Sequence, residues 1–181
     1  MRLKRTPLIL LFLLPLFSSC INNANFDQID LNADPIFEAS LVFFELTQFD
    51  FLDETQTIET LTLTDVTDID VFQTSTVRDN LRRVDLLYTV RNEFDRGYTI
   101  SGDLLDESGN VTYSFQTLSF GPGVTTRDHR ENINIENFPA VLNTTQMRFT
   151  ISLVPSTEIL DTSVERRIQF ESVGIFYLNI D

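Results

Sequence analysis

The chain has 181 residues, a formal net charge of −14 and a single cysteine. Three of the thirteen basic residues stand in the first five positions, and all 27 acidic residues come after residue 20. A surface this acidic repels nucleic acids and anionic headgroups, so we expect no nucleic-acid partner. One cysteine provides no disulfide framework, so the fold has to be held by packing, to which the 16 phenylalanines can contribute.

Residues 1–20 have the order of a secretory leader. Basic residues at positions 2, 4 and 5 precede an uninterrupted apolar stretch over 7–17, and two serines then precede Cys20. As a helix, the stretch would span about 16 Å, too short for a bilayer core about 30 Å thick. The pattern therefore predicts a signal peptide over residues 1–19 rather than a membrane-spanning helix.

Because the cysteine directly follows two small residues, the leader resembles that of bacterial lipoproteins, although Phe17 stands where leucine is usual. The resemblance implies cleavage before Cys20 and lipidation of its thiol, and two or three acyl chains hold a protein firmly to a membrane. Ile21 stands where an aspartate would imply inner-membrane retention, which points to the outer membrane. Residues 21–25 contain no acid, which favours the periplasmic face over the cell surface. A plain secretory leader with an incidental cysteine is the alternative.

We expect residues 20–34 to be the lipidated cysteine and a polar tether, and residues 35–181 to be one domain. Two structures compete for the apolar segment 36–52 at the start of that domain. Asp34 as N-cap with Pro35 at the first helical position suits a short helix. A strand is indicated instead by alternating apolar residues, namely Phe37, Ala39, Leu41 and Phe43. We expect a strand, because the later segments all have β patterns.

Alternation of apolar and polar residues with a period of two predicts strands through the rest of the chain. The residues expected on one face of these strands are Leu61 and Leu63; Ile69 and Val71; Val84, Leu86, Tyr88 and Val90; Tyr98, Ile100, Gly102 and Leu104; Val111, Tyr113 and Phe115; Met147, Phe149, Ile151 and Leu153; and Ile168, Phe170, Phe176, Leu178 and Ile180.

The segments between these patterns contain turn signals. Residues 106–110 predict a hairpin in which Gly109 takes positive φ, and 92–97 predicts another connection. Residues 124–145 are expected to be irregular, with one helical turn near Phe138-Pro139. About seven short strands predict an all-β fold, an antiparallel immunoglobulin-like β-sandwich. The chain has no tryptophan, so this likeness applies to the architecture alone.

The sequence offers little catalytic machinery. The only histidine, His129, lies in the segment expected to be a loop, and no Gly-x-Ser-x-Gly motif accompanies it. A zinc site needs several His, Cys or carboxylate ligands, which one histidine and a lipidated cysteine do not supply. We therefore expect a protein that is not an enzyme and that has no cofactor.

Calcium is the metal that an acidic chain fits best, because calcium takes only oxygen ligands. Asp65, Asp68 and Asp70 form one weak candidate cluster, and residues 50, 53 and 54 form another. Neither cluster matches the spacing of a calcium-binding loop, and on a strand Asp65 points away from Asp68. We expect these carboxylates to belong to solvent-exposed strand faces and loops.

The last predicted strand is apolar on both faces. Val173, Ile175 and Tyr177 share its second face, which indicates either a covered central strand or a patch that meets a partner. The leading functional hypothesis is therefore a non-catalytic structural or protein-interaction module, anchored in the outer membrane and bound to an envelope protein.

The alternative is a β-sandwich lipoprotein that binds a carbohydrate or another small ligand through exposed aromatic residues. Tyr88, Tyr98, Tyr113 and Tyr177 are the candidate platform, although three of them also suit the core. A third hypothesis is a calcium-stabilised adhesion module.

Overall fold

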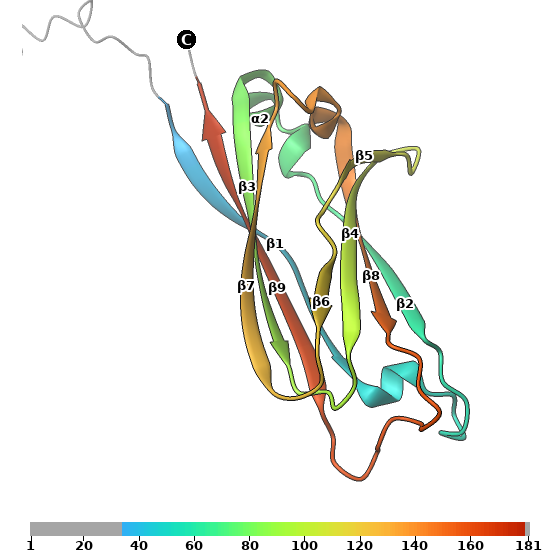
Figure 1. The fold of residues 1–181 in the computed structure, drawn as a ribbon. Coiled ribbons are helices and arrows are strands. Elements are labelled where there is room, and N and C mark those ends of the chain that lie inside the picture. Colours follow the sequence, from blue (N-terminus) through green and yellow to red (C-terminus); the bar gives the residue numbers. More distant parts are fainter. Residues whose placement is uncertain (1–33, 180–181) are drawn as a thin grey trace, which may run out of the picture. The chain divides into compact units, whose positions relative to one another are not determined.

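The computed structural model describes residues 34–179, which form two antiparallel β-sheets packed face to face (Figure 1). The strands are β1 (Ile36–Thr47), β2 (Thr62–Asp68), β3 (Leu81–Asn92), β4 (Tyr98–Asp106), β5 (Val111–Ser114), β6 (Leu118–Phe120), β7 (Thr125–Asn134), β8 (Thr144–Leu153) and β9 (Arg167–Leu178). The helical elements between them are η3 (Gln48–Phe51), η4 (Val71–Gln73), α2 (Ser75–Asn80) and η5 (Pro139–Asn143). The predicted all-β sandwich is confirmed. Cys20, the signal peptide, most of the tether and Ile180 lie outside the described residues.

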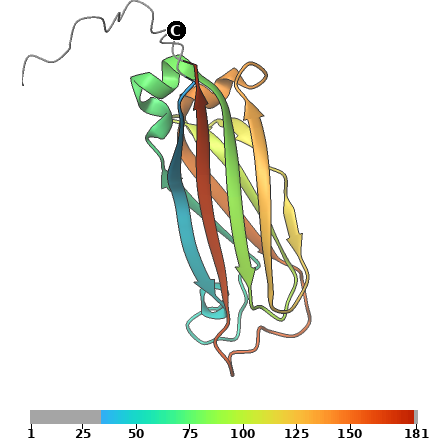
Figure 2. The ribbon, with the colours of Figure 1, turned by 90° about the vertical axis from the view of Figure 1, so that its left-hand side faces the viewer.

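The strands pair in a nested order. The first pairs with the last (β1 with β9), β2 pairs with β8, β3 with β7, and β4 with β5 and β6. Further pairs join these into one sheet of order β1-β9-β3-β7, seen face-on in Figure 2, and another of order β2-β8-β4-β5. This is the strand order of a jelly roll, the double-sheet arrangement built from Greek keys. Contacts between residues far apart in the sequence therefore hold both sheets together.

The long strands bury the faces that their alternation predicts. Val84, Leu86 and Val90 of β3 are fully buried, and the corresponding residues of β4, β8 and β9 face the space between the sheets. The predicted turn over residues 106–110 connects β4 to β5, and Gly109 there has a φ of 78°. The period of two was therefore a sound guide wherever one face of a strand is covered and the other is wet.

The segment 36–52 forms the strand β1 and then the 3-10 turn η3, which confirms the strand over its first twelve residues. A β-bulge interrupts β1, because Leu41 and Val42 together lie opposite the single residue Ser172 of β9. Ser172 is buried, and its hydroxyl accepts a hydrogen bond from the Val42 N–H at 2.9 Å and donates one to the Val42 carbonyl at 3.2 Å. One side chain thus satisfies both backbone groups that the bulge would leave unpaired.

The bulge reverses which face of β1 is buried. Phe43 was expected to continue the face of Phe37, but its side chain is 63% exposed. Phe44 points toward the other sheet instead, stacking on Phe170 with ring centroids 4.9 Å apart. The expectation for Phe43 was therefore wrong, because an extra residue in one strand moves all later side chains to the opposite face.

We predict that Ser172→Ala lowers the free energy of unfolding by about 1–3 kcal/mol, the cost of leaving a buried backbone donor and acceptor unpaired. Chemical denaturation of the wild type and the variant measures this difference. Ser101→Ala is the matched control, because Ser101 is only half-buried in β4. Equal stability of Ser172→Ala and the wild type would contradict the role given to the hydroxyl.

The centre of the sandwich is aromatic. The Phe149 ring of β8 meets four other rings, at centroid distances of 6.1 Å to Phe44, 6.3 Å to Tyr88, 6.0 Å to Phe115 and 4.4 Å to Phe170. These rings come from both sheets. Phe149 therefore joins the sheets at the level where Gly102 of β4 leaves room for the rings of Phe115 and Phe149.

Two further predictions about local structure were wrong. Ile69 and Val71 were expected in a strand, but β2 ends at Asp68 and the chain turns into η4 and α2. Ile69 is still buried, and so is Phe72, whose ring lies 5.5 Å from that of Phe176. These apolar residues are buried against the end of the sandwich, and their spacing was mistaken for the alternation of a strand.

The second error concerns residues 125–134, which were expected to be irregular and instead form β7. β7 is the edge strand beside β3, and Ile133 is its only fully buried apolar residue. An edge strand with few buried side chains has no apolar alternation to reveal it. The helical turn expected near Phe138-Pro139 is present as η5.

Candidate functional site

The three residues Val173, Ile175 and Tyr177 lie on the face of β9 that points away from the other sheet. Their inward-facing neighbours on β9 are buried, whereas these three side chains are half-buried. β9 is a central strand, between β1 and β3, and Ile36 of β1 lies beside Tyr177 with 60% of its side chain exposed. We call Ile36, Val173, Ile175 and Tyr177 the outer β9 face. It forms an apolar strip on the surface of an acidic chain.

A charged group flanks this strip on β3 and β7. Asp85 is only 1% exposed although it lies on the outer side of the sheet, because Arg83 and Arg130 cover it. The Arg83 Nε lies 3.2 Å from Asp85 Oδ1, and Arg130 Nη2 donates a hydrogen bond to Asp85 Oδ2. The hydrogen bond and the charge of Asp85 raise the pKa of the Arg130 guanidinium.

Both arginines also contact Tyr177. The Arg83 guanidinium carbon lies 3.8 Å from the centroid of the Tyr177 ring, and Arg130 Nη2 donates a 3.4 Å hydrogen bond to the Tyr177 hydroxyl. A cation over an aromatic face is attracted by the ring and limits its motion. Tyrosine and arginine beside aliphatic side chains are also the residues that protein interfaces favour at their centres. The two arginines therefore restrain the Tyr177 side chain. Together with the outer β9 face they contain residue types that are enriched at protein interfaces.

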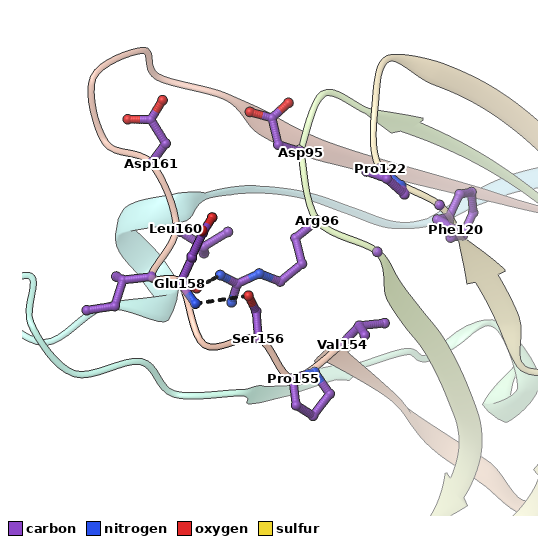
Figure 3. A pocket seen from close by; sticks show the side chains of 13 residues that line it. Asp95, Arg96, Phe120, Pro122, Val154, Pro155, Ser156, Glu158, Leu160 and Asp161 are labelled. Atoms are coloured by element: carbon purple, nitrogen blue, oxygen red, sulfur yellow. Dashed lines mark hydrogen bonds between the residues drawn. The ribbon is translucent and has the colours of Figure 1, made fainter.

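A pocket of about 550 Å³ lies among the loops at one end of the sandwich. Its lining comes from three connections, β3–β4, β6–β7 and β8–β9, and Figure 3 shows Arg96 extending between them. Arg96 donates a 2.6 Å hydrogen bond to Glu59 and another hydrogen bond to the Glu158 carbonyl, while Glu59 accepts one from the Leu160 N–H at 2.7 Å. Arg96 and Glu59 are each 11% exposed. Arg96 and Glu59 thus pair with each other and bind the backbone of the long β8–β9 connection.

Gln48 of η3 binds the same connection nearer to β9. Its side chain is buried, with Nε2 donating to the Val164 carbonyl at 2.8 Å and Oε1 accepting from the Arg166 N–H at 2.8 Å. One amide therefore binds both a carbonyl and an N–H of the loop. This arrangement indicates that the loops around the pocket are fixed by the fold.

We predict that Gln48→Ala loosens the segment 154–166, because both backbone partners of the amide are left without their hydrogen bonds. Limited proteolysis should cleave this segment faster than in the wild type, with the products identified by mass. Gln169→Ala is the control, because the amide of Gln169 is bonded only to exposed Glu45. Unchanged cleavage in Gln48→Ala would contradict the role of the amide.

The structure does not bring the calcium candidates together. Asp65 and Asp68 point to opposite faces of β2, since Asp65 pairs with buried Phe149 while the Asp68 carboxylate accepts a hydrogen bond from Gln146, and Asp70 lies beyond the strand. Within residues 34–179, no group of three or more His, Cys, Asp or Glu side chains is arranged to hold a metal ion. In the second cluster, Asp50 binds the backbone and hydroxyl of Thr47.

Asp53 of the second cluster organises the loop that follows η3. Its carboxylate accepts hydrogen bonds from the Thr55 hydroxyl at 2.5 Å, the Thr57 N–H at 2.8 Å and the Ile58 N–H at 2.9 Å. The hydrogen bond from Thr55, followed by those from the backbone, lowers the pKa of Asp53 from 3.8 to about 2. The negative charge of Asp53 thus stabilises the loop through these hydrogen bonds.

The depressed pKa predicts a loss of stability in acid. Because the pKa of Asp53 is lower in the folded state than in the unfolded state, its stabilisation is present above pH 4 and is lost as the pH falls from about 4 to about 2. Asp53→Asn keeps an acceptor for the backbone but does not titrate. Thermal unfolding between pH 2 and pH 6 should therefore show a smaller acid-induced fall in melting temperature for Asp53→Asn. A fall equal to that of the wild type would contradict this assignment.

The remaining residues singled out in the sequence are His129 and the four tyrosines. His129 lies on β7 rather than in a loop, with its Nε2 3.1 Å from Glu131 Oε1 and its ring stacked near Tyr88. Tyr88 and Tyr98 are buried, and burial raises the pKa of both hydroxyls. Two of the four tyrosines are thus inaccessible to a sugar, so the four do not form one platform.

Comparisons with known proteins do not assign this chain to a family. No protein-family description and no curated protein matches it. Among solved structures, it is similar to a protein from Parabacteroides distasonis described as secreted, with a TM-score of 0.47, 12% identity and coverage of 64% of this chain and 38% of that chain. It is also similar to the VP2 subviral particle of infectious bursal disease virus, with a TM-score of 0.46, 7% identity and coverage of 80% and 32%.

A third similar structure is that of Desmodium yellow mottle tymovirus, with a TM-score of 0.35, 13% identity and coverage of 83% of this chain and 91% of that chain. The chain thus spans about a third of the length of each of the first two structures. Likenesses of this strength carry no argument about function. In residues 34–179, no helix is both long enough and apolar enough to cross a membrane.

Proposed function

We propose that this protein is a non-catalytic lipoprotein of the bacterial outer membrane, facing the periplasm, whose β-sandwich is an interaction module for an envelope protein. The leader supports the anchoring, because Cys20 follows the basic, apolar and small residues that lipoprotein processing requires. The polar segment 21–33 then separates the lipid from the domain. The proposal accounts for the strongly acidic chain, which remains soluble and is repelled by anionic headgroups.

The outer β9 face is the observation that carries the proposed interaction. A solvated sheet face usually carries polar residues, whereas this one presents Ile36, Val173, Ile175 and Tyr177 in one strip. The Arg83–Asp85–Arg130 group beside the strip adds donors in fixed positions. An envelope protein with an apolar surface bordered by acceptor groups is the partner that this face fits.

Capture of the native lipidated protein from gently solubilised envelopes tests the proposal. We expect one stoichiometric envelope protein to be captured by the wild type and lost in Tyr177→Ala. Phe43→Ala should retain it, because Phe43 is a more exposed aromatic residue on the outer side of β1 but lies beyond the strip, opposite Glu171. Cys20→Ala should leave the protein outside the membrane fraction. Capture that is unchanged in Tyr177→Ala would contradict the role of the outer β9 face.

A further inference from the structure

The described sheets have edge strands that differ in how well they are protected against pairing with another chain. β5 and β6 have only four and three residues. β7 carries five consecutive ionisable residues, 127–131, and the bulge at Ser172 breaks the edge of β1. Short length, charge and bulges are the usual means of protecting an edge. β2 is less protected: its seven residues run in unbroken register with β8 and contain no proline and no basic residue, and its only charged residues are Asp65 and Asp68.

Within residues 34–179, no strand pairs with β2 on the side away from β8. At its two ends, the Leu61 carbonyl accepts from Leu153 N–H and the Ile69 N–H donates to the Thr145 carbonyl, so these residues point to β8. In an antiparallel strand, alternate residues direct both backbone groups to the same side. Thr62, Thr64, Val66 and Asp68 therefore direct their N–H and C=O groups to the free edge of the sheet.

An apolar cleft of about 320 Å³ opens beside this edge. It lies between strands of the two sheets, with a lining of Phe44, Leu46, Asp50, Leu63, Thr64, Asp65, Phe149 and Ile151. A strand added to β2 would direct every second side chain toward this space, next to the inward-facing residues Leu63 and Asp65. The volume suits one or two apolar side chains.

The charge of the cleft defines what can occupy it. The Asp65 carboxylate faces the cleft, is exposed, and makes no hydrogen bond or ion pair within residues 34–179. Asp50 lies at the same opening, and no basic side chain lines it. A strand with an arginine or lysine next to Asp65 would be attracted, whereas an acidic strand would be repelled.

We infer that the edge of β2 accepts an extended segment of a partner protein by β-strand addition. The segment alternates polar residues with apolar residues that enter the cleft, and it carries arginine or lysine at the position beside Asp65. The β2 edge of a second copy is a poor occupant, because β2 carries two aspartates and no basic residue, and each copy has a net charge of −14. The inference goes beyond the proposed function, since β2 and the outer β9 face lie in different sheets.

Fluorescence anisotropy with a labelled synthetic peptide and the full-length protein in mild detergent tests the inference. The peptide has nine residues, in which threonine alternates with valine or leucine and one apolar position carries arginine. We expect saturable binding, and affinity about two- to fivefold lower when glutamate replaces the arginine, as for a partly exposed ion pair. Asp65→Arg should reverse this preference. No saturable binding to the wild type, or a preference unchanged in Asp65→Arg, would overturn the inference.

Val66→Pro tests the pairing itself. It removes an N–H that points to the free edge and breaks no hydrogen bond to β8, so the fold should persist, as thermal unfolding would verify. Peptide affinity should fall about tenfold or more, while the matched variant Val66→Thr and the outer-face variant Tyr177→Ala keep wild-type affinity. Unchanged binding in Val66→Pro overturns the inference. So does a dimer of the wild type that Val66→Pro dissociates, because the edge would then belong to a second copy.

Discussion

Phe149→Ala should lower the free energy of unfolding by about 3–5 kcal/mol. The Phe149 ring is 5% exposed and contacts the rings of Phe44, Tyr88, Phe115 and Phe170. Its removal leaves a cavity between the two sheets that rings from both sheets cannot readily fill. Because domains have about 5–15 kcal/mol of stability in total, the variant should be barely folded at 37 °C.

Chemical denaturation of the wild type, Phe149→Leu and Phe149→Ala measures this effect. Phe149→Leu keeps most of the apolar volume and should lose less than half as much as Phe149→Ala. Phe43→Ala is the exposed control, because the Phe43 ring is 63% exposed and should cost little. A loss below about 1 kcal/mol for Phe149→Ala would contradict the central position given to this ring.

Gly102→Ala should destabilise the protein by about 1–3 kcal/mol although it adds a single methyl group. A Cβ at position 102 would lie 2.4 Å from Cδ2 of Phe115 and 2.8 Å from Cε1 of Phe149. Neither ring can retreat easily, because Phe149 is packed against Phe170 with centroids 4.4 Å apart. The methyl group therefore forces the aromatic centre of the sandwich apart.

Gly121→Ala is the matched control for this prediction. A Cβ at position 121 would meet no atom within 4 Å, so alanine there should leave the stability unchanged or raise it slightly. The comparison of midpoints in a denaturant titration isolates packing from the loss of glycine's backbone freedom. Equal midpoints for Gly102→Ala and Gly121→Ala would contradict the close packing around Gly102.

The sequence predicted the strands that bury one face and missed features that depend on the partner strand. Tyr98, Ile100, Gly102 and Leu104 could be placed on one side of β4 because their polar neighbours face outward. The steric need for glycine at 102 could not be predicted, because the two rings that fill the space come from β5–β6 and β8. The alternation of apolar and polar residues predicts which face of a strand is buried. Which side chains meet on that face depends on the register between strands.

The bulge in β1 and the strand β7 illustrate the same limit. Nothing in the sequence around Leu41 and Val42 indicates that Ser172, 130 residues away, will supply the hydrogen bonds of a bulge. β7 was missed because its polar residues 127–131 resemble a loop. Those that alternate with the outward-facing Arg130 are tolerated on the inner face because β7 is an edge. The nested strand order that creates both situations comes from contacts between distant segments.

For the candidate site, the sequence identified the residues but not their surroundings. Val173, Ile175 and Tyr177 could be assigned to one face of the last strand from their spacing. Their contact with Arg83 and Arg130 depends on β3 lying beside β9 and on β7 lying beside β3. The cleft beside β2 was not predicted at all, because β1 and η3 line it together with β2 and β8 of the other sheet.

If both proposals hold, the outer β9 face and the edge of β2 bind different partners. The outer β9 face would hold a folded envelope partner, while the edge of β2, in the other sheet, would hold an extended segment. Each surface can be removed alone, by Tyr177→Ala or by Val66→Pro. Failure of one proposal therefore leaves the other open to its own test.

The mass of the mature N-terminal peptide, measured on protein taken from the membrane fraction of a bacterial host, tests the anchoring on which the proposed function depends. The account predicts a peptide that begins at Cys20 and carries a diacylglyceryl group with a further acyl chain. An unmodified Cys20 in protein recovered from the culture medium or the cytosol would contradict it.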